Sequence, residues 1–286
     1  MSEIYLNGAF VPVEAARISV LDRGFLFGDG VYEVIPAYGG RPLRLAEHLV
    51  RLGNSLRGIG MTEPLEHDQW AAVFEQLLAK AAGVDQVLYV QVTRGAPPVR
   101  DHRFPDDVPP TVLAMAKVLK PRDPVIAEFG VAAIVRDDIR WSRCDIKSIS
   151  LLAAVLLREE AEQADAEEAL LVRDGHVVEG STSNLFICRA GRIVTPPKGT
   201  MLLPGVTRDL VLDLVRGAGL PADERAIAAE ELAAADEVWI TSSTREVVPV
   251  TRVDGVPIGD GTPGPLWRQV DGLYQDCKAD LRGYRV

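Results

Sequence analysis

Cysteine and histidine are scarce in this chain of 286 residues. The three cysteines, Cys144, Cys188 and Cys277, lie far apart and form no C-x-x-C pair, so neither a disulfide framework nor a zinc site is expected. The four histidines show no H-E-x-x-H or other paired spacing, so we expect no catalytic metal. Because unpaired cysteines are usual in a reducing compartment, the sequence favours a cytoplasmic protein.

Positive charge and long apolar runs are also lacking. The net charge is −10, with 25% charged and 47% hydrophobic residues, which is typical of a soluble acidic protein and does not favour nucleic-acid binding. No stretch reaches 18 apolar residues and the N-terminus has no basic region followed by an apolar run, so we expect neither membrane spanning nor secretion. Rossmann, P-loop and G-x-S-x-G motifs are absent from the sequence too.

Strand and helix patterns alternate along the chain. Asn7-Gly8 between two short apolar runs predicts a hairpin, and further strands are predicted at 31–38, 87–94, 111–117, 129–135, 168–173, through residue 177, at 185–188 and at 238–241. Helical spacing predicts helices at 45–56, 70–82, 151–164 and 205–216. Prolines in Lys120–Pro124 suggest a linker, hence a domain of residues 1–120 and a larger one of residues 121–286. The pattern favours a mixed α/β (α+β) fold over a doubly wound parallel sheet.

Lysine is the rarer basic residue: the chain has six lysines, and the other 25 of its 31 basic residues are arginines. Lys147 follows Cys144-Asp145-Ile146, and 32 residues later Glu179 stands in Val178-Glu179-Gly180. A partly desolvated lysine amine can lose its proton and form an imine, which a guanidinium cannot do. The alternative is an exposed lysine paired with Asp145, and it is the commoner situation for a single lysine.

Two segments have the features of an anion site. Gly205-Val206-Thr207 at a predicted helix start offers backbone N–H groups, a hydroxyl and the positive end of a helix dipole. Ser242-Ser243-Thr244 offers further hydroxyls just after a predicted strand. Together they would suit a phosphate, although each by itself is a common helix cap or turn.

Six motifs in a fixed order span nearly the whole chain. They are Asp22-Arg23-Gly24 with Gly28-Asp29-Gly30-Val31-Tyr32-Glu33, Glu47-His48-Leu49 with Arg51-Leu52, Ile146-Lys147, Val178-Glu179-Gly180 with Ser183-Asn184-Leu185-Phe186, Gly205-Val206-Thr207-Arg208, and Thr241-Ser242. In this order they resemble the class IV aminotransferases, the pyridoxal phosphate enzymes of fold type IV. The resemblance implies a homodimer of subunits with two mixed α/β domains and the cofactor between them.

The resemblance assigns roles around the cofactor. It implies that Lys147 forms the Schiff base with pyridoxal phosphate and then acts as general acid and base. Glu179 would hydrogen-bond the pyridine nitrogen and keep it protonated. The phosphate would be held by Arg51, the backbone of Val206 and Thr207, Ser242 and Ser243, while the ring would be surrounded by Leu203, Ser181 and Ser183.

The loop Arg100-Asp101-His102 indicates the branch of the family, since it is similar to the loop of D-amino acid aminotransferases. There the arginine and histidine reach in from the neighbouring subunit and bind the substrate α-carboxylate, for which an arginine fork is well suited. Tyr32 would complete this carboxylate site and Arg140 would orient it. The alternative is that Arg100 and His102 are ordinary polar residues of an exposed loop.

The expected reaction is therefore transfer of an amino group from a D-amino acid such as D-alanine to an α-keto acid such as 2-oxoglutarate, in a ping-pong cycle. Leu26 and Pro36 depart from the pattern of that branch, because more polar residues are usual there. An (R)-selective amine transaminase or a branched-chain amino acid aminotransferase is the alternative, and an aminodeoxychorismate lyase is less favoured. A non-catalytic binding protein is disfavoured because Lys147 and Glu179 are both present.

Overall fold

The computed structural model describes residues 3–283, and their contacts divide the chain into two compact units. Unit 1 comprises residues 3–120 together with 146–151 and 281–283, and unit 2 comprises residues 121–145 and 152–280. The short segment 146–151 thus belongs to unit 1, although its chain neighbours on both sides belong to unit 2. The sequence boundary after residue 120 had placed this segment in the second domain.

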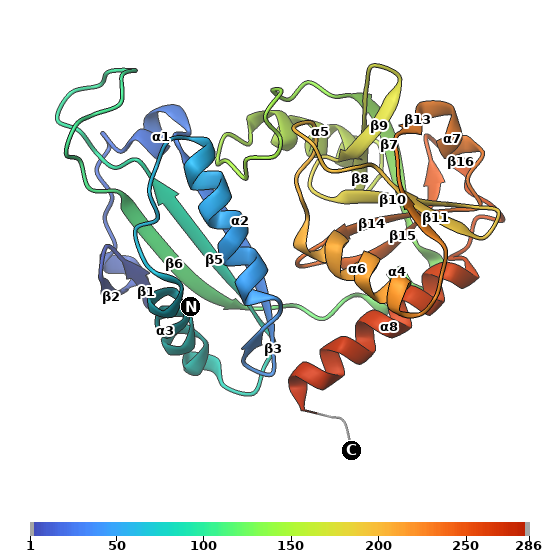
Figure 1. The fold of residues 1–286 in the computed structure, drawn as a ribbon, viewed down its shortest axis with the longest axis horizontal. Coiled ribbons are helices and arrows are strands. Elements are labelled where there is room, and N and C mark those ends of the chain that lie inside the picture. Colours follow the sequence, from blue (N-terminus) through green and yellow to red (C-terminus); the bar gives the residue numbers. More distant parts are fainter. Residues whose placement is uncertain (1–2, 284–286) are drawn as a thin grey trace. The chain divides into compact units, whose positions relative to one another are not determined.

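Unit 1 is built on one antiparallel sheet (Figure 1). Its strand order is β2-β1-β6-β5-β3-β4. The elements are β1 (Glu3–Leu6), β2 (Ala9–Pro12), a 3-10 turn at Val13–Ala15, α1 (Arg23–Phe27), β3 (Gly30–Tyr38), β4 (Arg41–Pro42), α2 (Leu45–Gly58), α3 (His67–Leu78), a 3-10 turn at Ala79–Ala81, β5 (Gln86–Thr93) and β6 (Thr111–Val118). The predicted Asn7-Gly8 hairpin is confirmed, because both residues have positive φ between β1 and β2.

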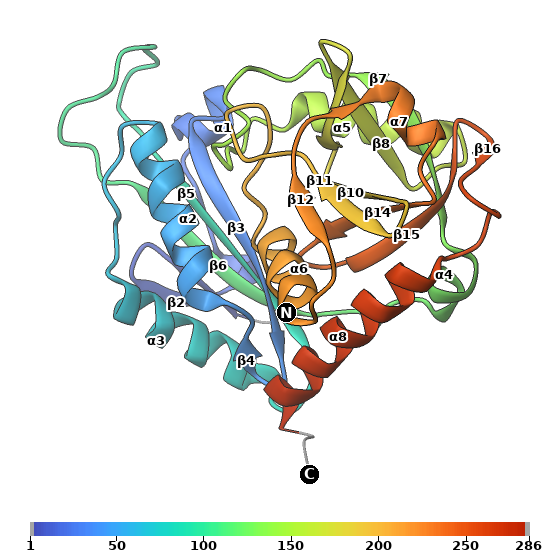
Figure 2. The same cartoon turned by 45° about the vertical axis from the view of Figure 1, so that its right-hand side comes forward.

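Helices α2 and α3 pack on one face of this sheet (Figures 1 and 2). The apolar residues that gave α2 its helical spacing, Leu49, Leu52 and Leu56, are buried in the same core as Trp70 and Phe74 of α3. Alternate residues of β3 and β5 supply the sheet side of this core. Residues of β3 that face the other way, among them Tyr32, are left for other contacts.

Unit 2 has a larger mixed sheet and several helices packed around it. The path of the sheet is β12-β11-β10-β14-β15-β7-β8-β9-β13, with β16 beside β15. The elements are α4 (Pro124–Phe129), β7 (Val131–Asp137), α5 (Leu152–Gln163), β8 (Glu168–Arg173), β9 (His176–Gly180), β10 (Asn184–Arg189), β11 (Arg192–Thr195), α6 (Val206–Gly217), β12 (Ala222–Glu224), β13 (Ile227–Ala228), α7 (Ala229–Ala233), β14 (Glu237–Ser242), β15 (Glu246–Val253), β16 (Val256–Pro257) and, ending in unit 1, α8 (Pro265–Arg282).

Parallel pairing occurs at three places in this sheet, namely β15 with β7, β7 with β8, and β11 with β12, and the other pairs are antiparallel. The predicted mixed fold is therefore confirmed. The predicted linker is shorter than expected, because Pro124 is already the first residue of α4, capped by the Asp123 carboxylate. Within residues 3–283, the structure has no helix long and apolar enough to span a bilayer.

Candidate active site

Lys147 is held by two elements of unit 1. Its backbone N–H donates to Ser55 Oγ on α2 at 3.1 Å, and its carbonyl oxygen accepts from the N–H of Tyr32 on β3 at 3.0 Å. The side chain is half-buried, and Nζ lies 4.1 Å from the centroid of the Tyr32 ring. The surface ion pair with Asp145 that was the alternative is absent among the described residues, where Asp145 instead pairs with Arg143.

A buried carboxylate links β3 to α2 beside this lysine. Glu33 Oε1 accepts from Arg51 Nε at 2.7 Å, Oε2 accepts from Arg51 Nη2 at 2.9 Å, and His48 Nδ1 lies 2.8 Å from Oε2. Burial raises the pKa of Glu33, but the charges of Arg51 and His48 outweigh it and hold the pKa well below its usual range. Burial also lowers the pKa of His48. Arg51 is thus fixed in a bidentate pair, and its contact with a phosphate stays a prediction.

Arg100 and His102 lie on the exposed loop between β5 and β6, and both contact one aromatic ring. The Arg100 guanidinium carbon lies 4.6 Å from the centroid of the Phe27 ring, and the His102 ring lies 5.1 Å from it. The loop therefore brings the two predicted carboxylate ligands together around the end of α1. Tyr32, Val34 and Pro36 share one face of β3, so Pro36 lies along the same face as the predicted substrate residue Tyr32.

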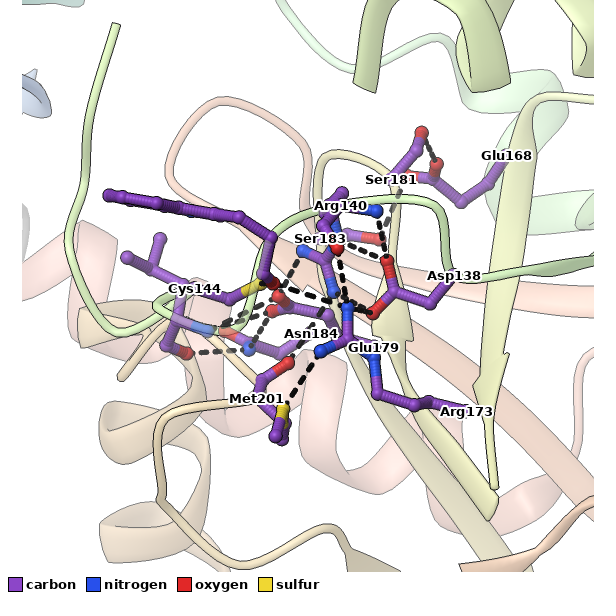
Figure 3. Close-up of polar contacts among 12 residues, drawn as sticks. Asp138, Arg140, Cys144, Glu168, Arg173, Glu179, Ser181, Ser183, Asn184 and Met201 are labelled. Atoms are coloured by element: carbon purple, nitrogen blue, oxygen red, sulfur yellow. Dashed lines mark hydrogen bonds and ion pairs between the residues drawn. The ribbon is translucent and has the colours of Figure 1, made fainter. Parts of the chain in front are cut away.

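Glu179, the last residue but one of β9, is the centre of a hydrogen-bond network in unit 2 (Figure 3). Its Oε1 accepts from Arg140 Nη1 at 2.5 Å, and its Oε2 accepts from Asn184 Nδ2 at 3.0 Å. The backbone N–H of Leu203 donates to both oxygens, at 3.2 and 3.1 Å. Burial raises the pKa of Glu179 to about 7, because desolvation of the carboxylate outweighs the effect of Arg140 and Leu203.

Arg140 is shared between two carboxylates (Figure 3). Besides Glu179 it binds Asp138, through Nε to Oδ1 at 2.8 Å and Nη2 to Oδ2 at 3.0 Å, and Arg173 lies 2.9 Å from the same Asp138 Oδ2. The sequence interpretation gave Arg140 a role at the substrate carboxylate. Within unit 2 its side-chain partners are Glu179, Asp138 and the carbonyl oxygen of Met201. Its role at the substrate carboxylate stays a prediction.

A second buried carboxylate fixes the turn that follows Glu179. Ser181, Thr182 and Ser183 all donate their hydroxyls to Glu168, Thr182 at 2.9 Å and Ser183 at 2.8 Å. Arg245 Nη2 donates to Glu168 Oε2 at 2.5 Å. Burial raises the pKa of Glu168, but Arg245 and the hydroxyls outweigh it and lower the pKa. The two serine hydroxyls are therefore used to shape the turn, and their contact with a cofactor stays a prediction.

The predicted anion site lies at the start of α6. Val206 and Thr207 form the first turn of the helix, whose N–H groups have no partners within the helix. The N-cap is Gly205, where a Cβ atom would overlap Asn184 Oδ1, so the absence of a side chain lets the turn approach Asn184. Thr241 pairs with Asn184 across β14 and β10, and its hydroxyl is buried without a hydrogen-bond partner among residues 3–283.

Sequence reasoning did not assign a role to the residues that position these groups, namely Glu33, His48, Asp138, Glu168, Arg173, Asn184 and Thr241. Glu33 and Glu168 could have been singled out from the sequence. Glu33 lies within the largely apolar strand β3, and Glu168 is the first residue of the largely apolar strand β8. An acid that is buried in this way needs cationic or hydrogen-bonding partners. The identity of those partners comes from distant elements and could not be read from spacing.

Comparison with known proteins identifies the family of this chain. The sequence pattern of the family described as amino-transferase class IV matches residues 30–253. A D-alanine aminotransferase of Bacillus licheniformis is 41% identical over 275 residues, 96% of this chain and 96% of that protein. One of Staphylococcus epidermidis is 39% identical over 277 residues, 96% of this chain and 97% of that protein.

A solved structure extends the likeness to the fold. The branched-chain aminotransferase of the archaeon Thermoproteus uzoniensis, solved with norvaline, has a TM-score of 0.85 at 28% identity, covering 98% of this chain and 95% of that chain. The expected type IV fold is confirmed. The match over more than half of the chain, with relatives near 40% identity along 96% of its length, places this protein in the class IV aminotransferase family.

Proposed function

We propose that this class IV aminotransferase is a D-amino acid transaminase that uses pyridoxal 5'-phosphate. The observation that carries the proposal is the likeness to D-alanine aminotransferases over 96% of the chain, and the position of Arg100 and His102 around Phe27 supports it. Family membership alone does not separate D-amino acids from other amino donors, because fold and function are only loosely linked.

The residues of unit 2 fit this cofactor. A carboxylate has about four lone-pair positions, and three donors of the described residues reach Glu179, so one position can accept the N–H of a pyridinium ring. A positively charged ring nitrogen next to this buried carboxylate would in turn favour the ionised form of Glu179. At the start of α6, N–H groups and the uncommitted Thr241 hydroxyl suit a phosphate.

Each residue then has a definite task. Bound pyridoxal phosphate supplies an electron sink for the charge that develops when the substrate Cα loses its proton. Lys147 would hold the cofactor covalently through Nζ. Once the substrate has displaced it, the free amine would take the proton from the substrate Cα and deliver it to the cofactor C4′ in the same half-reaction, and it would carry out the reverse transfer in the second half of the cycle. Glu179, oriented by Arg140 and Asn184, keeps the ring nitrogen protonated. Within unit 2 the first turn of α6 would hold the phosphate, and the phosphate contact of Arg51 stays a prediction.

Substrate recognition is assigned to the loop after β5. Arg100 and His102 bind the α-carboxylate of the amino acid, and Tyr32 lies at the same site as the lysine it contacts. The face of β3 that Tyr32 occupies is apolar at Pro36, which supports a small uncharged side chain in the substrate. D-Alanine as donor and 2-oxoglutarate as acceptor are the pair to test first.

Assembly as a homodimer is part of the proposal. Helix α5 exposes the apolar side chains of Leu152, Val155 and Leu156. Unit 1 separately exposes Val20 and Phe25, and both of these are more than 70% exposed. The three side chains on α5 stand three and four residues apart and so share one face of the helix, and an apolar face of this kind suits a protein interface. The three cysteines are free thiols, which supports a cytoplasmic location.

The experiment is a titration of the purified, cofactor-loaded protein while its visible absorbance is recorded. D-Alanine should convert the absorbance and release one equivalent of pyruvate, and 2-oxoglutarate should restore it. L-Leucine should leave the spectrum unchanged, and a better response to L-leucine would move the protein to the branched-chain branch. No response to any amine would contradict transaminase function.

A second candidate is (R)-selective amine transamination. Leu26, half-buried on α1, and Pro36 make the predicted pocket less polar than is usual for the D-amino acid branch. A response to (R)-1-phenylethylamine in the same titration would support this activity, while its absence would leave D-amino acids as the only donors among those tested.

A further inference from the structure

The loop between β5 and β6 is fastened at both ends by one buried acid. Asp22, which precedes α1, accepts from Thr93 Oγ1 at 2.9 Å and from Thr111 Oγ1 at 2.6 Å. Thr93 is the last residue of β5 and Thr111 is the first of β6. The carboxylate also accepts from the N–H of Gly24 at 2.8 Å and so caps α1. The base of the loop is therefore tied directly to the start of α1.

The next residue, Arg23, binds the middle of the same loop. Its guanidinium donates to three consecutive backbone carbonyls, those of Asp101 at 2.5 Å, His102 at 3.3 Å and Arg103 at 3.2 Å. Its side chain is only 5% exposed, whereas Arg100 and His102 beside those carbonyls are exposed. A buried cation thus holds the backbone on which the two exposed side chains stand.

Asp29 in turn fixes Arg23. Its Oδ2 accepts from Arg23 Nε at 2.7 Å and from Arg94 Nε at 2.8 Å. The guanidinium carbon of Arg94 lies 3.7 Å from the centroid of the Phe104 ring, further along the loop. Burial raises the pKa of Asp29, but the bonds from Arg94 and Arg23 outweigh it and lower the pKa, so the carboxylate is charged at neutral pH. The loop is therefore held by a chain of charged groups within unit 1.

We propose that Arg23 is a positioning residue for substrate specificity, which fixes the backbone of residues 101–103 so that Arg100 and His102 meet the substrate α-carboxylate. This inference rests on the proposed function. An arginine is needed because its planar fork can donate to Asp29 and to three carbonyls at once, which the compact ammonium of a lysine cannot do. The Asp22-Arg23 pair of the recognition motif thereby gains a function that sequence resemblance did not assign.

The test records the absorbance of the holoenzyme after rapid mixing with D-alanine, which follows the first half-reaction. The dependence of the rate on D-alanine concentration separates substrate affinity from the limiting rate. Arg23→Gln should raise the apparent Kd for D-alanine about tenfold and lower the limiting rate less than about threefold. The apparent Kd of Arg23→Lys should lie between those of the wild type and Arg23→Gln. A Kd like that of the wild type, or a loss in limiting rate as large as the loss in affinity, would overturn the inference.

A double-mutant cycle separates positioning from a direct or structural effect. If Arg23 acts through Arg100, then Arg23→Gln should weaken D-alanine binding less than about twofold when Arg100→Gln is already present. A full, additive loss in the double variant would show that Arg23 acts elsewhere. Should Arg23→Gln fail to fold, Asp29→Asn releases the guanidinium while keeping Arg23, and the same pattern of affinity loss is expected.

Arg103→Gln is the matched control, since Arg103 is exposed and its side chain binds only Asp101 among the described residues. Its Kd for D-alanine should remain within about twofold of the wild type, and an equal loss there would overturn the inference by showing general sensitivity of the loop. A wild type that does not respond to D-alanine would contradict the proposed function itself. A responding wild type and an impaired Arg100→Gln, with Arg23→Gln unimpaired, would contradict only the role of Arg23.

Discussion

Arg140 and Glu179, 39 residues apart in the chain, form a buried ion pair in which Nη1 and Oε1 are 2.5 Å apart. Asp138 binds the other side of the same guanidinium, so Arg140 balances two carboxylates. Burial raises the pKa of the Glu179 carboxylate to about 7. The ion pair therefore fixes the position of Glu179 without fully offsetting the cost of burying its charge.

Replacing Glu179 should reduce activity much more than stability. Glu179→Gln keeps the size of the side chain but cannot hold a proton on the cofactor ring nitrogen, so the rate of the D-alanine half-reaction should fall about 100-fold. Glu179→Asp is the control that retains a carboxylate and should keep more activity than the amide. Equal rates for wild type and Glu179→Gln in rapid mixing would contradict the assignment of Glu179 to the ring nitrogen.

The raised pKa of Glu179 predicts a pH dependence of stability in the cofactor-free protein. Between about pH 4.5 and 7 the folded protein keeps a proton that the unfolded chain releases, so the stability linked to Glu179 falls as pH rises through this window and is constant above it. Relative to Glu179→Gln, the wild type should therefore lose on the order of 3 kcal/mol of unfolding free energy between about pH 5 and 8. Denaturant unfolding of both proteins checks this, and parallel pH profiles would argue against a raised pKa.

Lys147→Arg should abolish covalent attachment of the cofactor. The guanidinium keeps a positive charge next to Tyr32 but cannot form an imine or exchange the Cα proton, so the half-reaction should slow by a factor on the order of 1,000. Mass spectrometry after borohydride reduction should find the cofactor on Lys147 in the wild type and no cofactor at position 147 in Lys147→Arg. Lys198→Arg, at an exposed ion pair with Asp209, is the control and should retain both properties.

Gly205→Ala should weaken cofactor binding. The added methyl group would overlap Asn184 Oδ1, displacing either the first turn of α6 or the amide that binds Glu179. Gly217→Ala at the other end of α6 is the matched control, because a Cβ atom there meets nothing within 4 Å, and it should stabilise the helix by about 0.5–1 kcal/mol. Cofactor titration and thermal unfolding measure the two effects, and unchanged cofactor affinity in Gly205→Ala would count against the site.

Glu33→Gln should destabilise unit 1. Arg51 and His48 would lose their buried carboxylate, which costs about 3–5 kcal/mol for a buried ion pair that is broken on one side. Glu47→Gln changes a half-exposed partner of Arg44 and should alter stability by less than about 0.5 kcal/mol. Chemical denaturation of both variants gives the comparison. A similar small effect in both would mean that the Glu33 network contributes little to folding.

Local structure in this protein follows closely from local sequence. The Asn7-Gly8 hairpin, the strand at β8 and the helix that begins after Gly205 all form where turn residues and apolar periodicity predict them. Helix α8 was missed, although its buried Trp267, Val270 and Tyr274 recur at helical spacing. Its strongly polar remainder hid that periodicity.

The candidate site was predictable only where one residue type has a distinctive chemistry. The roles of Lys147 and Glu179 follow from the motifs around them that resemble class IV aminotransferases; taken alone, Lys147 had the alternative of an exposed ion pair, and both roles stay predictions. The partners of Glu33 and Glu168 were not predictable. They lie 13 to 77 residues away in the chain, and only folding brings them within hydrogen-bond distance.

Because residues 146–151 group with unit 1, chimeras of this protein depend strongly on where the chain is cut. A chimera that exchanges residues 1–120 between two relatives would retain Lys147 of the recipient but replace Ser55 and Tyr32, which bind its backbone. A chimera that exchanges only residues 152–280 would keep the lysine and both of its backbone partners from the same parent. The lysine and the residues that bind its backbone can therefore be exchanged together only as two separate segments of the gene, residues 1–120 and residues 146–151.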